Sequence, residues 1–129
     1  MKKSVLIVED EENIANAERM ILEDEFDVHI AKDGMEGLRM AKDIKPDIVV
    51  LDLMLPRMDG LDVCKKIKTN KEIGSKVVMV TAKNQPNDEI KGMDFGADDY
   101  IMKPFEPIEL MHVINQVMSK IEEKTDDEE

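Results

Sequence analysis

Two short runs of consecutive apolar residues in the middle of the chain limit the folds that it can adopt. They are IVVL within DIVVL at residues 47–51 and VVMV within KVVMV at residues 76–80. An unbroken apolar run of this kind is typical of a central strand in a parallel sheet, which is buried on both faces. The chain is therefore expected to contain a parallel sheet with these two strands in its middle.

Hydrophobic periodicity predicts that strands and helices alternate along the whole chain. Residues 26–31 alternate apolar and polar side chains, as a half-exposed edge strand does. In the first helix, Ile14, Ala17 and Ile21 are expected to share the face that meets the core. The expected strands are 3–8, 26–31, 47–51, 76–80 and 99–102, and the expected helices are 12–23, 34–44, 61–68, 86–92 and 106–121.

This alternation, with short connections, builds a parallel sheet with helices on both faces through right-handed crossovers. Because the two apolar strands are central and strand 26–31 lies at an edge, the predicted strand order is 2-1-3-4-5. The fold class is therefore α/β, a doubly wound sandwich around a five-stranded sheet. Such folds carry their functional groups at the carboxyl ends of the strands.

Length and charge limit the functions of the chain. Its 129 residues are the size of one domain, which we expect to span residues 1–123. Residues 124–129, KTDDEE, are expected to form a disordered acidic tail or the stub of a linker. A net charge of −12 is the opposite of the basic footprint that nucleic-acid binding needs, so this domain is not expected to bind nucleic acid directly.

Cysteine usage and hydropathy indicate a cytoplasmic protein without membrane contact. No apolar run approaches the roughly 20 residues of a membrane-spanning helix, and no secretory signal is recognisable. The single cysteine, Cys64, allows no internal disulfide and fits a reducing compartment.

Charged and polar side chains follow four of the five predicted strands. The first strand leads into Glu9 and Asp10, the third into Asp52, the fourth into Thr81 and the fifth into Lys103. Because these strands are neighbours in the predicted order, three carboxylates, a hydroxyl and an ammonium group converge at one end of the sheet. Carboxylates this close repel one another unless a cation neutralises them.

The composition of this cluster predicts phosphoryl-transfer chemistry. Lys103 supplies one positive charge, and a hard divalent cation, Mg²⁺ or Mn²⁺, would supply the rest through oxygen ligands. Asp52 is then placed as a nucleophile that forms an acyl phosphate. The cation, Lys103 and the Thr81 hydroxyl would surround the phosphoryl oxygens during transfer.

Five motifs, in order along the chain, resemble those of response-regulator receiver domains. These are the chemotaxis-regulator-like (CheY-like) phosphoacceptor domains of two-component signalling, whose fold is a flavodoxin-like (βα)5 sandwich. The resemblance covers the chain up to the acidic tail. The motifs are VLIVEDE at 5–11, DLMLP at 52–56 with MDG at 58–60, VTA at 80–82, GADDY at 96–100 and KPF at 103–105.

The resemblance implies a set of metal-binding residues. Asp52 resembles the phosphoacceptor and Asp10 the direct Mg²⁺ ligand, while Glu9 resembles the second acid of the pocket, which often acts through water. Asp52 and the backbone carbonyl of Met54 would also bind the metal. Glu9 stands where the family more commonly has aspartate, a change that keeps the carboxylate.

The resemblance also implies a set of phosphoryl-binding and switch residues. Thr81 resembles the switch hydroxyl, Tyr100 the switch aromatic and Lys103 the ammonium that binds the phosphoryl group. Two residues support them, since a small Ala82 admits the phosphodonor and the peptide bond before Pro104 is commonly cis. Taken singly, Thr81 is also a candidate helix cap and Tyr100 a candidate packing residue.

The function implied by the resemblance is a signalling switch and not an enzyme. A histidine kinase or histidine phosphotransfer protein would phosphorylate Asp52. The signal would then emerge on the face of the fourth helix, the fifth strand and the last helix, around Ile90, Met102, Met111 and Val113. It would act on a downstream protein, on an output domain after Glu129, or on a second copy in a phosphorylation-linked homodimer.

Other functions are weighed against this one. Haloacid-dehalogenase-type phosphatases also use a strand-end aspartate with Mg²⁺, but they carry a second acid where this chain has Met54. A receiver fold that binds partners without phosphorylation remains an alternative, against which the complete pocket argues. A nucleotide-binding domain is disfavoured because Glu9 and Asp10, in place of a glycine-rich loop, follow the first strand.

Overall fold

The computed structural model describes residues 2–55, 58–82 and 96–127. The predicted helix at 86–92 lies outside these residues, and the other predicted elements are found with ends shifted by a few residues. In chain order they are β1 (Ser4–Val8), α1 (Glu12–Leu22), β2 (Asp27–Ala31), α2 (Gly34–Ile44), β3 (Ile48–Asp52), α3 (Gly60–Thr69), β4 (Lys76–Ala82), β5 (Asp99–Lys103) and α5 (Pro107–Asp127).

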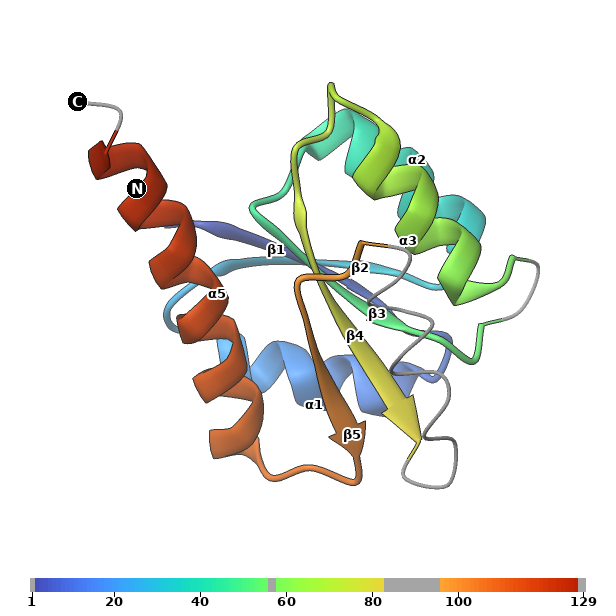
Figure 1. The fold of residues 1–129 in the computed structure, drawn as a ribbon. Coiled ribbons are helices and arrows are strands. Elements are labelled where there is room, and N and C mark those ends of the chain that lie inside the picture. The colour runs from blue at the N-terminus through green and yellow to red at the C-terminus, as the bar shows by residue number, and fades with distance from the viewer. Residues whose placement is uncertain (1, 56–57, 83–95, 128–129) are drawn as a thin grey trace.

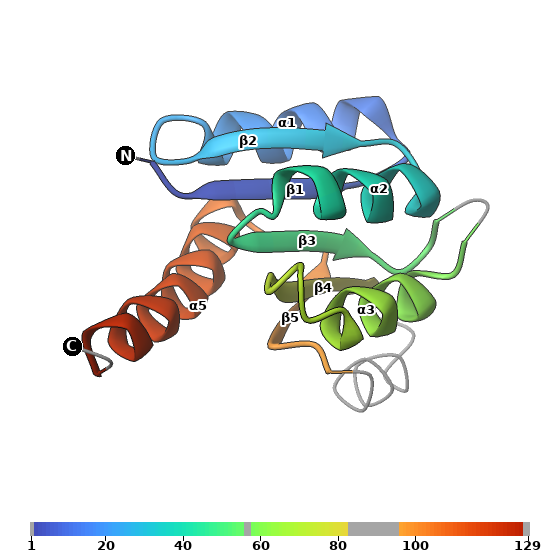
Figure 2. The ribbon, with the colours of Figure 1, turned by 90° about the horizontal axis from the view of Figure 1, so that it is seen from above.

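The strands form one parallel sheet in the order β2-β1-β3-β4-β5, which confirms the predicted topology. Figures 1 and 2 show α1 and α5 on one face of the sheet and α2 and α3 on the other. Every residue of β3 is buried, whereas β2, at the edge, is mostly half-buried. The unbroken apolar run therefore does mark a central strand, and the alternating run an edge.

Each face of the sheet has its own apolar layer. Ile7 of β1 and Ile114 of α5 belong to the layer under α1 and α5. Leu6 of β1 and Ile67 of α3 belong to the layer under α2 and α3. Burial of apolar surface in these layers is the main force that holds the helices to the sheet. It also fixes the strands so that their carboxyl ends share one edge.

The face of α1 that meets the core only partly matches the predicted one, since Ile14 and Ile21 are half-buried. Ala17 is exposed, while Ala15, Glu18 and Leu22 are buried. The buried residues are three and four positions apart, so they form one stripe along the helix. Because Ala15 and Leu22 define the stripe that packs on the sheet, Glu18 is carried into the core between them.

Helix α5 is longer than its apolar pattern predicts. The expected end is residue 121, but the helix continues to Asp127 and so includes residues 124–127 of the segment assigned to a tail. The sequence after Ile121 begins with Glu-Glu-Lys, which are good helix formers, and this accounts for the continuation. The boundary between domain and tail at residue 123 stays a prediction.

Gly60, the first residue of α3, lies against the chain that leaves β3. Asp59 caps the helix, because its carboxylate accepts a hydrogen bond from the Leu61 N–H at 2.9 Å. A Cβ atom on Gly60 would lie 2.6 Å from Leu53 Cα and 2.8 Å from the backbone oxygen of Asp52. Backbone atoms cannot turn aside as a side chain can, so this close approach requires glycine.

We expect Gly60→Ala to lower the free energy of unfolding by about 1–3 kcal/mol, since α3 must move away from the backbone after β3. Urea unfolding followed by circular dichroism measures the change. Lys66→Ala, at an exposed position of the same helix, is the control and should change stability by less than about 0.5 kcal/mol. A Gly60→Ala protein as stable as this control would contradict the proposed contact.

Candidate functional site

Three carboxylates meet at one end of the sheet. Glu9 and Asp10 directly follow β1, and Asp52 is the last residue of the neighbouring strand β3. The register pairs Val8 with Leu51, so the residues that follow emerge side by side. One carboxylate oxygen of each acid lies within 4.8 Å of the others. The structure therefore brings together the three acids that the strand ends predicted to converge.

The ammonium group of Lys103 lies between two of these acids. Its Nζ is 2.9 Å from Oε1 of Glu9 and 2.8 Å from Oδ2 of Asp52. Lys103 ends β5, so its side chain reaches past β4 to contact both carboxylates. The two carboxylates are largely buried, which shields these ion pairs from water and makes them stronger than surface pairs.

The carboxylate of Asp52 is held at both oxygens. While Oδ2 contacts Lys103, Oδ1 accepts a hydrogen bond from the backbone N–H of Met54 at 2.9 Å. An aspartate that binds the N–H two residues later forms a local turn, and this turn carries the chain out of β3. The side chain of Met54 is exposed, but its backbone is fixed beside the acids. Asp52 thus has a defined orientation.

Burial and charge set the protonation of the cluster. Burial, opposed by the hydrogen bond from Lys103 and assisted by the charge of Asp52, raises the pKa of Glu9 to about 7. Burial alone would lower the pKa of Lys103, but the hydrogen bonds and charges of Asp52 and Glu9 outweigh it and raise the pKa above its usual range. Lys103 is therefore charged at neutral pH, and Glu9 takes up a proton more readily than a solvent-exposed glutamate does.

The donor set fits a hard divalent cation. Three carboxylates with oxygens within 4.8 Å of one another are the ligand type that Mg²⁺ and Mn²⁺ prefer. A single lysine does not balance three negative charges. Asp10 is exposed, so it offers an oxygen at the open side of the cluster. The residues of this pocket are consistent with the predicted metal site.

Thr81 and Tyr100 lie on neighbouring strands and share one face of the sheet. Tyr100 is paired in register with Met79, two residues before Thr81. Side chains two residues apart in a strand point the same way, so Thr81 and Tyr100 are on the same side. Thr81 is buried, and Tyr100 is half-buried against the apolar layer under α2 and α3. The two predicted switch residues are therefore close in the sheet.

The two predicted supporting residues also border the site. Ala82, the last residue of β4, is paired in register with Lys103. The peptide bond between Lys103 and Pro104 is cis, as the resemblance implies.

Sequence analysis missed one buried acid near this cluster. Glu18 of α1 is only 3% exposed. The pKa of Glu18 is raised to about 7, mainly by burial and next by the negative charge of Glu9. The positive charge of Lys103 lowers this pKa, and the negative charge of Asp52 raises it further. The sequence held a signal, since Glu18 falls on the stripe that joins Ala15 and Leu22.

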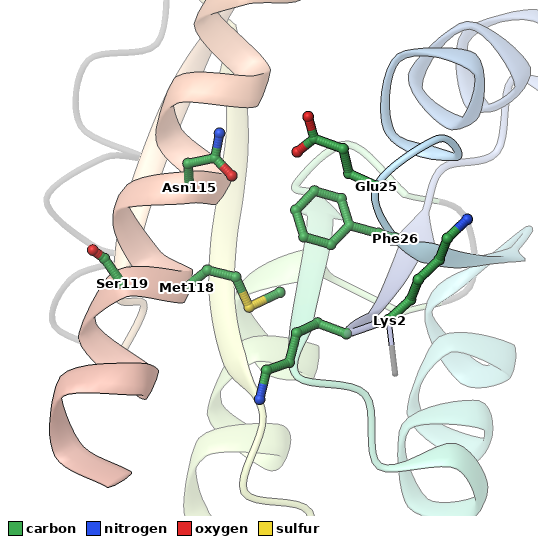
Figure 3. Close-up of a pocket in the computed structure, with 7 residues that line it drawn as sticks. Lys2, Glu25, Phe26, Asn115, Met118 and Ser119 are labelled. Carbon is green, nitrogen blue, oxygen red and sulfur yellow. The ribbon is translucent and has the colours of Figure 1, made fainter. Parts of the chain in front are cut away.

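A hollow lies at the amino ends of the strands, at the opposite end of the sheet from the three acids. It has a volume of about 570 Å³ and is bordered by the start of the chain, the turn before β2, and α5. In Figure 3, Phe26 and Met118 face each other across it, with Lys2, Glu25 and Asn115 around them. Its lining residues hold one carboxylate and no grouped acids. The candidate chemistry is therefore at the carboxyl ends of the strands.

Comparison with known sequences identifies relatives of the chain. The family model of the response regulator receiver domain matches residues 5–115. The chain is 41% identical over 123 residues to the alkaline phosphatase synthesis transcriptional regulatory protein PhoP of Bacillus subtilis, covering 95% of this chain and 51% of that protein. It is 42% identical over 112 residues to the DNA-binding response regulator MtrA of Mycobacterium tuberculosis, covering 86% and 48%. The chain spans about half the length of these curated relatives.

Comparison with solved structures agrees. The chemotaxis response regulator CheY4 of Vibrio cholerae superposes with a TM-score of 0.85 at 27% identity, covering 91% of this chain and 99% of that one. A CheY-like receiver domain protein of Methanospirillum hungatei has a TM-score of 0.88 at 30% identity, covering 96% and 99%.

Within the described residues, none of the helices has the length and apolar character that a bilayer span requires.

We expect Lys103→Gln to destabilise the metal-free protein by about 2–3 kcal/mol at about pH 8, because it leaves two buried carboxylates without a counter-charge. The loss should be smaller at about pH 5. Since the folded-state pKa of Glu9 is raised to about 7, Glu9 is protonated and stabilising below this value and loses that stabilisation as the pH rises through it.

Urea unfolding in EDTA at both pH values measures the effect. Lys76→Gln is the control. It also removes a lysine that contacts a carboxylate, Asp98 at 3.9 Å, but Lys76 begins β4 and so lies at the end of the strand away from Glu9 and Asp52. An equal loss for Lys103→Gln at both pH values would contradict the role of Glu9.

Proposed function

The chain belongs to the response regulator receiver domain family, and we propose that it is a phosphorylation-dependent signalling switch with Asp52 as its phosphoacceptor. One observation carries this proposal. The Asp52 carboxylate ends a buried central strand, has the Lys103 ammonium at 2.8 Å, and lies next to two further acids. A nucleophile, a fixed positive charge and a cation-binding donor set therefore occupy one small site.

The reaction begins at one oxygen of Asp52. That oxygen attacks the phosphorus atom of a phosphohistidine on a histidine kinase or a histidine phosphotransfer protein. The P–O bond forms as the P–N bond breaks, and the electron pair of the P–N bond stays with the imidazole nitrogen. A proton already on the other ring nitrogen of the phosphohistidine lets the ring leave as neutral imidazole. The products are an acyl phosphate on Asp52 and a free histidine on the donor.

The remaining residues of the pocket stabilise the transferred group. Mg²⁺, when bound, supplies positive charge for the phosphoryl oxygens. Asp10, Asp52 and the backbone carbonyl of Met54 would hold it directly, and Glu9 would act through water. Lys103 donates to a phosphoryl oxygen once the charge of Asp52 has passed to the phosphoryl group. The hydrogen bond from Lys103 to Glu9 keeps this ammonium beside the acceptor meanwhile.

The identity of Met54 argues for a switch and against a phosphatase. A thioether offers no proton to exchange, so a methionine two residues after the acceptor cannot act as the general acid or base that hydrolysis needs. Met54 is 63% exposed, and its side chain carries no other group that could catalyse hydrolysis. We therefore expect the acyl phosphate to be lost slowly.

The signal is transmitted from Thr81 to Tyr100. Phosphoryl oxygens on Asp52 provide an acceptor that the Thr81 hydroxyl reaches by moving inward, and Tyr100 turns into the space that Thr81 leaves on their shared face. Tyr100, Met102 and Val113 line a groove of about 420 Å³ between β5 and α5, which this turn would reshape. A differential binding energy of a few kcal/mol is enough to shift such an equilibrium. Ile90, also expected on this face, lies outside the described residues.

The output of the switch is a change in protein contact. The relatives named above are described as transcriptional or DNA-binding regulators and are about twice as long as this chain. On this basis the receiver domain, residues 1–123, would act on an adjoining output domain, a separate partner or a second copy. The net charge of the whole chain, −12, leaves any contact with DNA to another domain.

We expect incubation with acetyl phosphate and Mg²⁺ to add one phosphoryl group to Asp52, because this donor needs no partner protein. Intact-mass spectrometry measures the addition, and mild base should remove it, as it removes acyl phosphates. Asp52→Asn should remain unmodified. Asp59→Asn, which changes an exposed aspartate of the next loop, is the control and should be modified like the wild type. A phosphoryl group on Asp52→Asn would refute the assignment.

Thr81→Ala should separate phosphorylation from signalling. Asp52 keeps its pocket in this variant, so it should still be phosphorylated, but the ring of Tyr100 should no longer change its surroundings. NMR spectra of the Tyr100 ring, recorded before and after addition of acetyl phosphate and Mg²⁺, report this change. Thr69→Ala, at an exposed position of α3, should respond like the wild type. The switch is disproved if the ring responds equally in Thr81→Ala.

A further inference from the structure

Glu18 is a buried carboxyl group that the proposed phosphoryl transfer does not use. It lies between Ala15 and Leu22 on α1, which packs against β1, β2 and α5. Only 3% of its surface is exposed. Among the described residues, none forms a hydrogen bond or an ion pair with its carboxyl group. Its oxygens are not sealed from solvent, so it can exchange a proton with water.

The surroundings of Glu18 give it no neutralising partner of its own. Ile30 of β2 and Ile114 of α5 belong to this apolar layer. Ala15, one turn before Glu18 on the same stripe of α1, borders a cavity together with Glu9 and Asp10, so the stripe runs from the acidic pocket to Glu18. The charged groups that act on it are at the acidic pocket, namely Glu9 after β1, Asp52 of β3 and Lys103 of β5. A carboxyl group in such a layer is favoured in its neutral form. In agreement, burial is the largest cause that raises the pKa of Glu18 to about 7.

We propose that Glu18 is a proton-linked partner of the cation site: a divalent cation bound in the acidic pocket displaces a proton from Glu18 to the solvent, without touching Glu18. The inference rests on the cation site of the proposed function and adds a regulation of it. Cation affinity then depends on pH through a residue outside the site.

The charges that already act on Glu18 fix the sign of this effect. The negative charges of Glu9 and Asp52 oppose ionisation of Glu18, so a cation held between those two carboxylates favours it. Linkage is reciprocal, and ionised Glu18 must strengthen cation binding by the same factor by which the cation promotes its ionisation. The cation should therefore bind more tightly as the pH rises through about 7, the pKa of Glu18.

The same group acts on the stability of the metal-free protein. Its folded-state pKa is raised, so Glu18 stabilises the fold below its unfolded pKa and loses that stabilisation as the pH rises through about 7. Glu18→Gln in EDTA should therefore unfold at higher urea than the wild type at about pH 8. At about pH 5 the difference should shrink. This readout needs no cation.

The direct test is isothermal titration calorimetry of Mg²⁺ binding at about pH 6 and about pH 8. We compare the wild type with Glu18→Gln and with Glu18→Leu, which suits the apolar layer if glutamine does not. The gain in affinity from the lower to the higher pH should be smaller in both variants by roughly fivefold, the lower end of typical coupling between two sites. Buffers of different ionisation enthalpy should also report fewer protons released by the variants.

Glu12→Gln is the matched control. Glu12 is exposed on the same helix and lines a cavity together with Glu9 and Asp10. The variant therefore removes one charge near the acidic pocket and leaves the buried Glu18 unchanged. It should keep the pH-dependent gain of the wild type. Equal gains and equal proton release in the wild type and both Glu18 variants would overturn the proposal. Failure of the wild type to bind Mg²⁺ at either pH would instead overturn the cation site and this inference with it.

Discussion

The arrangement of the candidate site depends on the balance of charge at the carboxyl end of the sheet. Glu9 and Asp52 are buried where strands meet, and Lys103 is 2.9 Å and 2.8 Å from their oxygens. Two buried carboxylates with oxygens within 4.8 Å of each other repel strongly unless a positive group lies between them. Lys103 can make both contacts because it is the last residue of β5 and its side chain reaches past β4. A single lysine leaves a residual negative charge that suits a divalent cation.

The rest of the fold makes this unfavourable cluster tolerable. The apolar layers on the two faces of the sheet contribute the stabilisation, and they hold the strand ends where the acids are forced together. Local contacts then fix orientation, since the Met54 N–H binds Asp52 and Gly60 lets α3 approach the backbone beside it. The stable apolar layers thus hold together carboxylates that repel one another, as is usual for sites that bind charged groups.

The sequence predicted features that depend on one element at a time. An unbroken apolar run marked β3 as central and alternation marked β2 as an edge, and these two facts fixed the strand order. Strand-end residues then predicted the meeting of Asp52 and Lys103. Features that depend on how elements pack were missed. The inward face of α1 was wrong at Ala17, and Glu18 was overlooked, because the rotation of a helix is decided by the surface that it covers. Likewise, only the packed structure shows that Gly60 is required by a close approach.

We propose that Asp52 accepts a phosphoryl group while Lys103 and a divalent cation neutralise its charge. A crystal structure of the protein with Mg²⁺ and beryllofluoride, a phosphoryl mimic, is the decisive experiment. We expect beryllium bonded to an oxygen of Asp52, Mg²⁺ on oxygens of Asp10 and Asp52, and Lys103 Nζ within hydrogen-bonding distance of a fluorine. If Asp52 stays unmodified under saturating Mg²⁺ and beryllofluoride, with Lys103 still bridging it to Glu9, Asp52 is not the phosphoacceptor.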